Sequence, residues 1–397
     1  MNDFGHLSDY FTGVAAKRLS VVEVDEKRSN QHEINGVAEL KQLFGVEKLA
    51  VTARFIYLGE DEDTTLRANA SMTWYDARAQ HPKRTEHRLY YQSNPVMTKA
   101  APGDLMLLAR RVDGEVLVIV AKRDSSQENR LLWVFSLEEQ ADRFSVGMMS
   151  PARDKDIDFT VRTILEDLDQ VVEPTESDYL ETMRNRFGEE FPFTSVFSAF
   201  ARSTLPDVCA KDDPDGAMML WFDREEFLFR TFERHIVMKQ LEIGFKSVEE
   251  FIKCSLSVLN RRKSRVGFAV EHHLEQVFIE NGIAYSHGAI TENRAKPDFL
   301  FPSIMAYRNP DFPSSSLRML GVKSSCKDRW RQVLSEAARI DHKHLFTLEG
   351  GISVAQTNEM RSHQLSLVLP LRIHSTFRQE QRDQIMSLKD FLKNLTD

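Results

Sequence analysis

Two short segments in the C-terminal half carry residues suited to phosphodiester chemistry. Residues 296–303 read KPDFLFPS, and residues 321–337 read GVKSSCKDRWRQVLSEA. Asp298 precedes one apolar run, and Lys323 follows another, and both runs are expected to be strands. If the two strands are neighbours, the carboxylate and the ammonium group meet at one edge of a sheet. Hydrolysis of a phosphodiester needs a metal-activated water and a cation beside the phosphate, so this pair predicts a hydrolytic site.

A metal at this edge needs a second carboxylate, and two glutamates qualify. Glu336 borders the apolar stripe of the helix expected after Lys323. Glu271 borders the apolar stripe of an earlier helix, residues 265–280. We predict that Asp298 and Glu336 hold the metal, that Lys323 stabilises charge on the phosphate, and that Glu271 assists. An exposed, solvated glutamate is the alternative for both helical positions.

Several charged runs predict contacts with DNA, although the chain carries a net charge of −8. Net charge reports on solubility, whereas binding depends on local patches. The run RRKSR at 261–265 predicts phosphate contacts, and the run at 323–331 offers donors for guanine and an acceptor for cytosine. Solvated helix faces, or a polar hairpin tip at 83–88, are the alternatives. The residues assigned to DNA are Arg84, Glu86, His87, Arg88, Arg262, Lys263, Lys327, Asp328, Arg329 and Arg331.

The elements that position these residues divide into two parts. The first part is rich in β-branched and aromatic residues, and the pair Asp113-Gly114 is a strong hairpin signal, so an antiparallel barrel or sandwich is expected. Its predicted strands are residues 49–58, 68–75, 104–112 and 115–123. An acidic stretch follows, and then helical periodicity at 227–245, 248–262 and 265–280. Alternating strands and helices after residue 280 predict a mixed sheet with helices on its faces. We therefore predict a domain at 1–165, a linker at 166–178 and a second domain at 179–397.

Length, cysteine usage and hydropathy narrow the class of protein. A chain of 397 residues predicts two domains. Cys209, Cys254 and Cys326 are scattered without a CxxC pair, which argues against structural zinc or disulfides and indicates a reducing cytoplasm. The mixed N-terminus has no signal-peptide pattern. The longest apolar runs, such as 116–121, are far short of the roughly 20 residues of a membrane helix, so no membrane partner is expected.

The C-terminal motifs resemble those of the PD-(D/E)XK nucleases. Pro297-Asp298 and Lys323 match, but Gly321 stands where most members have an acid. In one branch, the EcoRII type of restriction endonucleases, the acid lies after the lysine, as Glu336 does. That branch also has Lys-x-x-x-(Lys/Arg)-(Asp/Glu)-Arg, which begins here at Lys323 and ends at Arg329. The resemblance extends over 244–350, including GFKSVEEFI, NRRKSR and AITENRAKPDFLFPS.

The first half of the chain resembles the effector domain of the same type. AKRLS at 16–20, NQHEINGV at 30–37 and KRTEHR at 83–88 carry this likeness, which implies a β-rich pseudobarrel that binds a second copy of the DNA site. The fold class expected is thus mixed, with this pseudobarrel followed by an α/β nuclease domain.

The resemblance implies a bacterial, cytoplasmic, Mg²⁺-dependent type II restriction endonuclease. It would cut double-stranded DNA at a short CC/GG-containing palindromic or near-palindromic site, under control of a second site. It implies a homodimer through the C-terminal domain and a cognate DNA methyltransferase as a separate protein. The alternatives are a DNA-binding regulator that retains a nuclease fold, and a methylation-dependent nuclease.

Overall fold

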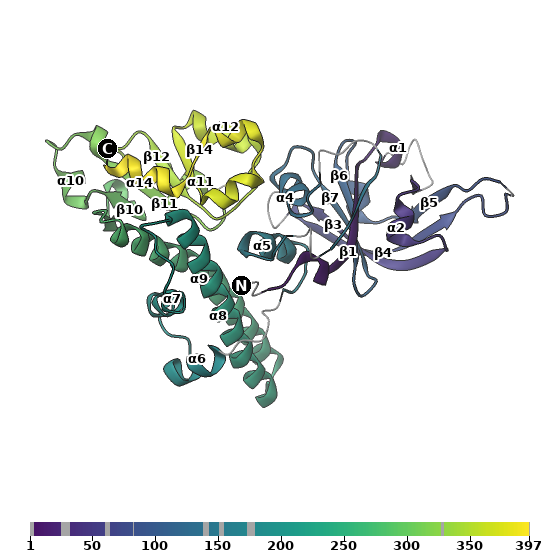
Figure 1. Cartoon of the computed structure of the whole chain (residues 1–397), viewed down its shortest axis with the longest axis horizontal. Coiled ribbons are helices and arrows are strands. Elements are labelled where there is room, and N and C mark those ends of the chain that lie inside the picture. Colours follow the sequence, from purple (N-terminus) through teal and green to yellow (C-terminus); the bar gives the residue numbers. More distant parts are fainter. Residues whose placement is uncertain are drawn as a thin grey trace. The chain divides into compact units, whose positions relative to one another are not determined.

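The computed structural model describes residues 4–24, 32–59, 64–81, 83–137, 143–150, 155–172, 179–326 and 329–396. Contacts divide the chain into two compact units (Figure 1). Unit 1 is Met1–Val172 with Gly351–Ser353, and unit 2 is Glu173–Gly350 with Val354–Asp397. Helix α5 (Phe159–Asp167) extends into the predicted linker, and residues 173–178 of that linker lie outside the described residues. The linker therefore stays a prediction.

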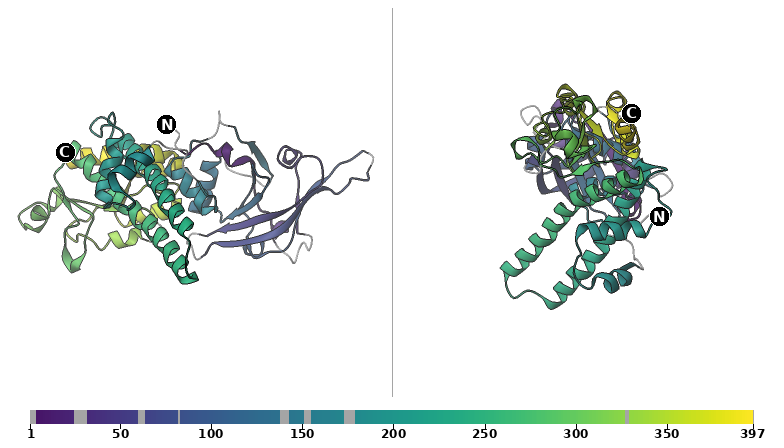
Figure 2. Two further views of the ribbon diagram at one scale, coloured as in Figure 1. Left: turned by 90° about the horizontal axis from the view of Figure 1, so that it is seen from below. Right: turned by 90° about the vertical axis from the view of Figure 1, so that its left-hand side faces the viewer.

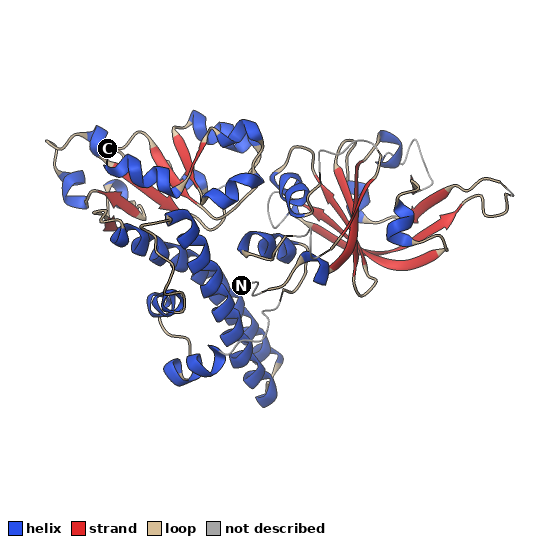
Figure 3. Cartoon of the chain, viewed as in Figure 1, coloured by secondary structure: helices blue, strands red, loops and turns tan. Residues whose placement is uncertain are grey.

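Unit 1 is built on one curved sheet of eight strands (Figure 3). Its order is β2-β5-β4-β3-β7-β6-β1-β8, and every neighbouring pair is antiparallel except β3 and β7, which are parallel. The purely antiparallel arrangement expected from the sequence is wrong at this one pair. The strands are β1 (Phe11–Arg18), β2 (Glu33–Asn35), β3 (Leu49–Leu58), β4 (Leu66–Asp76), β5 (His87–Tyr91), β6 (Leu105–Arg111), β7 (Val116–Ala121) and β8 (Ser145–Met148).

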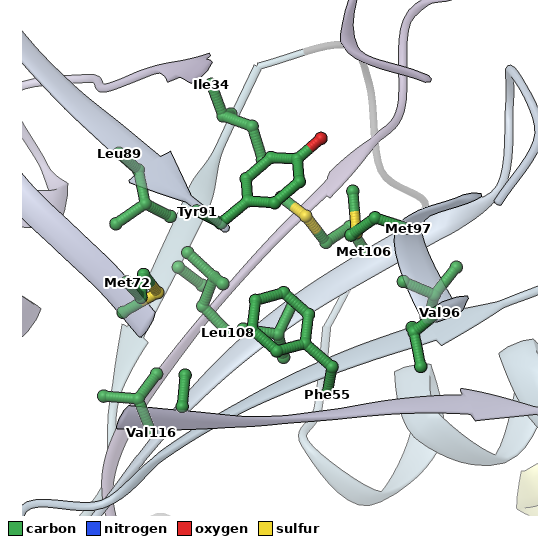
Figure 4. Packing of buried hydrophobic residues seen from close by; sticks show 14 of the residues in the cluster. Ile34, Phe55, Met72, Leu89, Tyr91, Val96, Met97, Met106, Leu108 and Val116 are labelled. Atoms are coloured by element: carbon green, nitrogen blue, oxygen red, sulfur yellow. The ribbon is translucent and has the colours of Figure 1, made fainter. Parts of the chain in front are cut away.

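The concave face of this sheet holds the core of unit 1. Side chains from alternate strand positions, such as Phe55, Tyr91 and Leu108, pack there against Val96 and Met97 of α3 (Figure 4). Each such burial contributes about 1.5–3 kcal/mol. The hairpin predicted at Asp113-Gly114 joins β6 to β7, and Gly114 has a φ of 90°, which glycine adopts without strain. The helices of this unit are α1 (Val21–Val24), α2 (Leu40–Phe44), α3 (Pro95–Lys99), α4 (Ser126–Val134) and α5.

Unit 2 begins with four helices: α6 (Tyr179–Phe187), α7 (Thr194–Ser203), α8 (Pro214–Ile243) and α9 (Val248–Glu280). The last two form a long antiparallel hairpin (Figure 2). Gly244, with a φ of 79°, ends α8, and the Ser247 side chain caps α9 by accepting from Glu250 N at 3.2 Å. The segments 248–262 and 265–280, treated separately in the sequence, form this one helix. Arg265 lies buried at its middle in an ion pair with Glu225 of α8, which holds the two halves in line.

The rest of unit 2 is a mixed six-stranded sheet with helices, as the sequence predicts. Its order is β14-β13-β12-β11-β10-β9; β9, β10 and β11 are antiparallel, and β11 to β14 are parallel. The strands are β9 (Ser286–His287), β10 (Phe299–Phe301), β11 (Arg318–Val322), β12 (Lys343–Phe346), β13 (Leu365–Val368) and β14 (Ile385–Met386). The helices are α10 (Ile304–Arg308), α11 (Trp330–Val333), α12 (Val354–Ser362), α13 (Gln379–Arg382) and α14 (Leu388–Thr396). No helix among the described residues is long and apolar enough to cross a membrane.

The helix after Lys323 is much shorter than predicted. Helix α11 ends at Val333, so Glu336 lies in the following turn and not on a helix. The amide of Glu336 bonds the carbonyl of Val333, three residues back, at 3.1 Å, which tightens the backbone. Ala337 then has a φ of 48°, a left-handed conformation that ends the helical path.

Candidate active site

Asp298 and Lys323 meet at one edge of the second sheet because β10 and β11 are antiparallel neighbours. Phe299 pairs with Leu320, so Asp298 lies just before one strand and Lys323 just after the other. The Asp298 Oδ2 atom accepts a hydrogen bond from Val322 N at 2.6 Å and lies 3.3 Å from Lys323 Nζ. Burial raises the pKa of Asp298, while Lys323 and the Val322 amide oppose this shift. The predicted juxtaposition of these two residues is confirmed by the strand pairing.

Glu336 reaches the same place from the turn after α11. Burial raises the pKa of its carboxyl to about 7, the charge of Lys323 lowers it, and the charge of Asp298 raises it. The charges of Lys323 and Asp298 therefore both act on the Glu336 carboxyl. Its Oε2 atom is buried and has no hydrogen-bond partner among the described residues. A buried carboxylate oxygen without a donor is costly unless something else contacts it.

Glu271 approaches from α9 and is held by a histidine. His287 Nε2 lies 2.9 Å from Glu271 Oε2, and His287 Nδ1 lies 3.0 Å from Glu275 Oε1. The hydrogen bonds that His287 donates to these two carboxylates raise its pKa to about 10. The His287 ring also stacks on Phe299, with ring centroids 4.8 Å apart. The charge of Glu271 contributes to the raised pKa of Asp298, and the catalytic roles of the four residues stay predictions.

The arrangement fits a hard divalent cation. Among the described residues, no group of three or more His, Cys, Asp or Glu side chains is placed to hold a metal ion. Mg²⁺ does not need such a group, because it binds through one or two carboxylates together with water and substrate phosphates. Asp298 offers one carboxylate, and the Oε2 atom of Glu336 offers a second oxygen that no protein donor occupies.

The comparisons with known proteins concern this part of the chain. Residues 229–392 match the family model described as EcoRII C terminal. Residues 229–392 form an EcoRII C-terminal domain. The type II restriction enzyme EcoRII of Escherichia coli is 46% identical over 185 residues, which cover 46% of this chain and 46% of that enzyme. The matched part is thus less than half the length of this relative.

Two solved structures are also similar to the chain. Metal-depleted Ecl18kI in complex with uncleaved, modified DNA covers 55% of this chain and 82% of its own, with 16% identity and a TM-score of 0.46. The PspGI–substrate DNA complex covers 52% of this chain and 92% of its own, with 17% identity and a TM-score of 0.42.

Residues that were not predicted from the sequence hold the turn that carries Glu336 in place. Lys343 of β12 is buried and donates to the carbonyl oxygens of Ile340, at 2.5 Å, and Ala337, at 3.5 Å. The charge of Glu336 acts to raise the pKa of Lys343, although burial lowers it overall. The pairing of β11 with β12 places Lys343 at the end of the strands opposite Lys323, so its link to the site is through the Glu336 turn and not through Lys323.

A second set of hydrogen bonds holds the same turn from the side of α10. Glu292 Oε2 accepts from the Tyr307 hydroxyl at 2.6 Å and from Ala338 N at 3.4 Å. The Arg339 guanidinium donates to the carbonyls of Asn309 and Phe312, both at 2.9 Å. The short helix α11 is therefore followed by a turn fixed from two directions, and Glu336 lies at its start.

The residues assigned to DNA in this domain have mixed surroundings. Arg329 lies immediately before α11, and Lys327 and Asp328 lie outside the described residues. Arg331 binds both carboxylate oxygens of Glu359, at 2.8 and 2.9 Å, on the protein surface. Exposed pairs of this kind are worth about 0–1 kcal/mol and open readily. The DNA roles of these four residues stay predictions.

The predicted DNA cluster of unit 1 is only partly a loop. Arg84 and Glu86 precede β5, but His87 and Arg88 belong to that strand. Arg88 pairs with Glu33 and with Glu86, both at 2.7 Å, and the hydrogen bond from Arg88 lowers the pKa of Glu86. His87 is 8% exposed, and its ring packs 4.9 Å from that of Trp74. The loop assignment is therefore wrong for His87 and Arg88, which lie in β5, whereas the DNA roles of all four residues stay predictions.

Proposed function

We propose that the chain is a type II site-specific restriction endonuclease that hydrolyses double-stranded DNA. Its target would be a short CC/GG-containing palindromic or near-palindromic site, and its metal Mg²⁺. The observation that carries the proposal is the pair of Asp298 and Lys323 at one sheet edge, within the residues that match the EcoRII C-terminal family. The charges of both residues also act on Glu336.

The chemistry follows from the surroundings of each side chain. Asp298 and Glu336 would hold Mg²⁺, which when bound offsets phosphate charge and makes water more acidic. Lys323 would stabilise the negative oxygens of the phosphate as water forms the new P–O bond and the bond to the leaving sugar oxygen breaks. The Val322 amide and Lys323 fix the Asp298 carboxylate. Glu271, held by His287, would assist at the same edge.

Recognition would involve both units. A palindromic site favours a two-fold symmetric homodimer through the EcoRII C-terminal domain. Arg329 would read bases beside Lys327 and Asp328, and unit 1 would bind a second copy of the site through Arg84 and its neighbours. Such control requires that the second DNA copy favour the active state of the protein. A separate methyltransferase would protect host DNA in the bacterial cytoplasm.

The test is digestion of unmethylated and methylated DNA with Mg²⁺, followed by sequencing of the ends. We expect ends at one short CC/GG-containing site in unmethylated DNA, and a loss of at least about 100-fold in rate for Lys323→Ala. Arg361→Ala, on α12, is the control for loss of a cation. Specific binding without cleavage by the wild type would favour the regulator, and cleavage of methylated DNA alone would favour the methylation-dependent nuclease.

Control by a second site has its own test. We expect the full chain to cut plasmids with two sites faster than plasmids with one. Equal initial rates on both substrates would leave unit 1 without a regulatory role.

A further inference from the structure

The segment that follows β11 is tied at two points to the segment that follows β12. Lys323 N donates to Phe346 O at 3.0 Å, which continues the pairing of these two strands. Three residues further along both segments, Cys326 N donates to Glu349 Oε2. The carboxylate of Glu349 thus takes the place that a backbone carbonyl would have in a longer ladder, and it holds the segment beyond the end of the strand pairing.

Cys326 is the residue from which the path into α11 starts. Its side chain is buried, and its carbonyl accepts hydrogen bonds from Arg329 N at 2.8 Å and from Trp330 N at 3.2 Å. These two bonds form the turn that leads into α11. Because Glu349 binds the amide of the same residue, its carboxylate helps to fix where Arg329 leaves the sheet edge.

Glu349 is itself held by the body of the sheet. Its amide donates to Thr347 Oγ1 at 3.1 Å, and the amide of the buried Thr347 donates to Val368 O of β13 at 3.2 Å. Burial raises the pKa of the Cys326 thiol, and so does the charge of Glu349, whereas a hydrogen bond with Thr347 lowers it. The pairing of β12 with β13 therefore determines where the Glu349 carboxylate lies, and both Thr347 and Glu349 act on Cys326.

The charge of Glu349 separates two possible uses of this hydrogen bond. A charged acceptor binds a backbone amide more tightly than a neutral one does, so the carboxylate strengthens the hold on Cys326. The same negative charge opposes the approach of DNA phosphates to this edge, so it cannot serve affinity for the backbone. A group that weakens general attraction while it fixes the segment before Arg329 is suited to setting geometry.

We propose that Glu349 is a positioning residue for sequence recognition, which holds Cys326 so that Arg329 meets its base in the correct place. The inference rests on the proposed function, in which Arg329 reads bases beside Lys327 and Asp328. It adds the residue that fixes the start of this reading segment. Glu349 acts through Cys326 and not by touching DNA, so its loss should weaken preference for the target more than affinity for DNA in general.

The experiment is competition binding by the full chain in EDTA, with two short duplexes as probes. One carries the site recovered by selecting bound duplexes from a random pool, and the other has one G·C pair of that site replaced by A·T. Glu349→Ala should reduce the ratio of the two affinities by about 5–100-fold, the range for loss of one base contact. Affinity for a random duplex should stay within a few-fold of wild type. Glu349→Gln keeps an oxygen acceptor for Cys326 N and should keep most of the wild-type ratio.

Glu280→Ala is the matched control within unit 2. Glu280 Oε2 accepts from Ala210 N at 2.7 Å, which is also a bond between a carboxylate and the amide of a distant segment. Its loss should leave the ratio unchanged, and urea unfolding of each variant checks that the fold is intact. If Glu349→Ala does not fold, Thr347→Val takes its place, because it removes the hydroxyl that holds Glu349 and keeps the shape of the side chain. This variant should also lower the ratio.

Four results would overturn the proposal. They are an unchanged ratio in Glu349→Ala, or in Thr347→Val where that variant replaces it; equal losses on target and random duplexes; a loss in Glu349→Gln as large as in Glu349→Ala; and the same loss in Glu280→Ala.

Cleavage measured in parallel separates this inference from the proposed function. A wild type that cuts DNA at one site, with an unchanged ratio in Glu349→Ala, leaves the function standing and the positioning role wrong. A wild type that binds its site selectively, loses this selectivity in Glu349→Ala and never cuts supports the role of Glu349 and contradicts the function.

Discussion

Replacing Glu336 by glutamine should stabilise the metal-free protein at alkaline pH. Burial raises the pKa of Glu336 to about 7 from an ordinary value of 4.5. A pKa that is higher in the folded state contributes stability that is present below the unfolded value and is lost as pH rises through about 7. One pKa unit corresponds to about 1.4 kcal/mol, so the shift sets an upper limit of about 3 kcal/mol. Glutamine never ionises, so Glu336→Gln should gain about 1–3 kcal/mol above this pH.

The assay is urea unfolding in the presence of EDTA, followed by the fluorescence of the buried tryptophans of unit 2, which include Trp330. We expect the variant to unfold at higher urea than wild type at about pH 8, and the gain to shrink at about pH 5, where the wild-type carboxyl carries its proton. Glu242→Gln, at an exposed glutamate of α8, should leave the midpoint of urea unfolding unchanged at both pH values. Cleavage by Glu336→Gln should be absent. A variant no more stable than wild type at about pH 8 would refute the view that Glu336 is held as a costly buried anion.

Three further substitutions test the remaining parts of the site. Asp298→Asn should abolish cleavage yet leave specific binding within a few-fold of wild type, and full cleavage by this variant in a gel-based assay would remove Asp298 from the site. Lys343→Met should slow single-turnover cleavage by about 10–100-fold and raise the Mg²⁺ concentration needed for cleavage, because the Glu336 turn loses its charged donor. Lys343→Arg should restore part of the rate, and an unchanged Mg²⁺ dependence in Lys343→Met would make Lys343 structural only. Arg329→Ala should cost about 1–3 kcal/mol of discrimination at a guanine in competition binding, and equal losses on target and random duplexes would identify a phosphate contact instead.

The parts of the structure that sequence could predict are those fixed by local pattern. The bounds of β3 were predicted to the residue because LAVTARFIYL is rich in β-branched and aromatic residues. Asp298 and Lys323 were predictable because each directly flanks a short apolar strand, and the pairing of two such strands was the simplest arrangement. The stripe beside Glu336 predicted a carboxylate near this edge, although the helix that was expected to carry it ends at Val333, and its role in holding a metal stays a prediction.

The parts that sequence could not predict depend on contacts between distant segments. β1 lies between β6 and β8, yet FTGVAAKR shows no alternation because almost every residue in it is buried. The parallel pairing of β3 with β7 joins strands 63 residues apart at Ala53 and Val116. His287 lies in a strand of two residues, which is too short to show any periodicity. Its partners Glu271 and Glu275 come from helix α9.

The run RRKSR shows that cations clustered in the sequence can form ion pairs within the fold. Arg265 is buried between the rings of Phe197 and Phe229, each 4.4 Å from its guanidinium, and pairs with Glu225. Arg262 bonds the buried carboxylate of Glu233 at 2.6 Å. Both therefore face α8, and their charges are largely neutralised within unit 2.

Lys263 is exposed, and its contact with a DNA phosphate stays a prediction. Because its ion pair with Glu233 limits Arg262 as a phosphate contact, affinity for DNA has to come largely from other cations. We therefore expect recognition in unit 2 to depend most on Arg329, which lies immediately before α11.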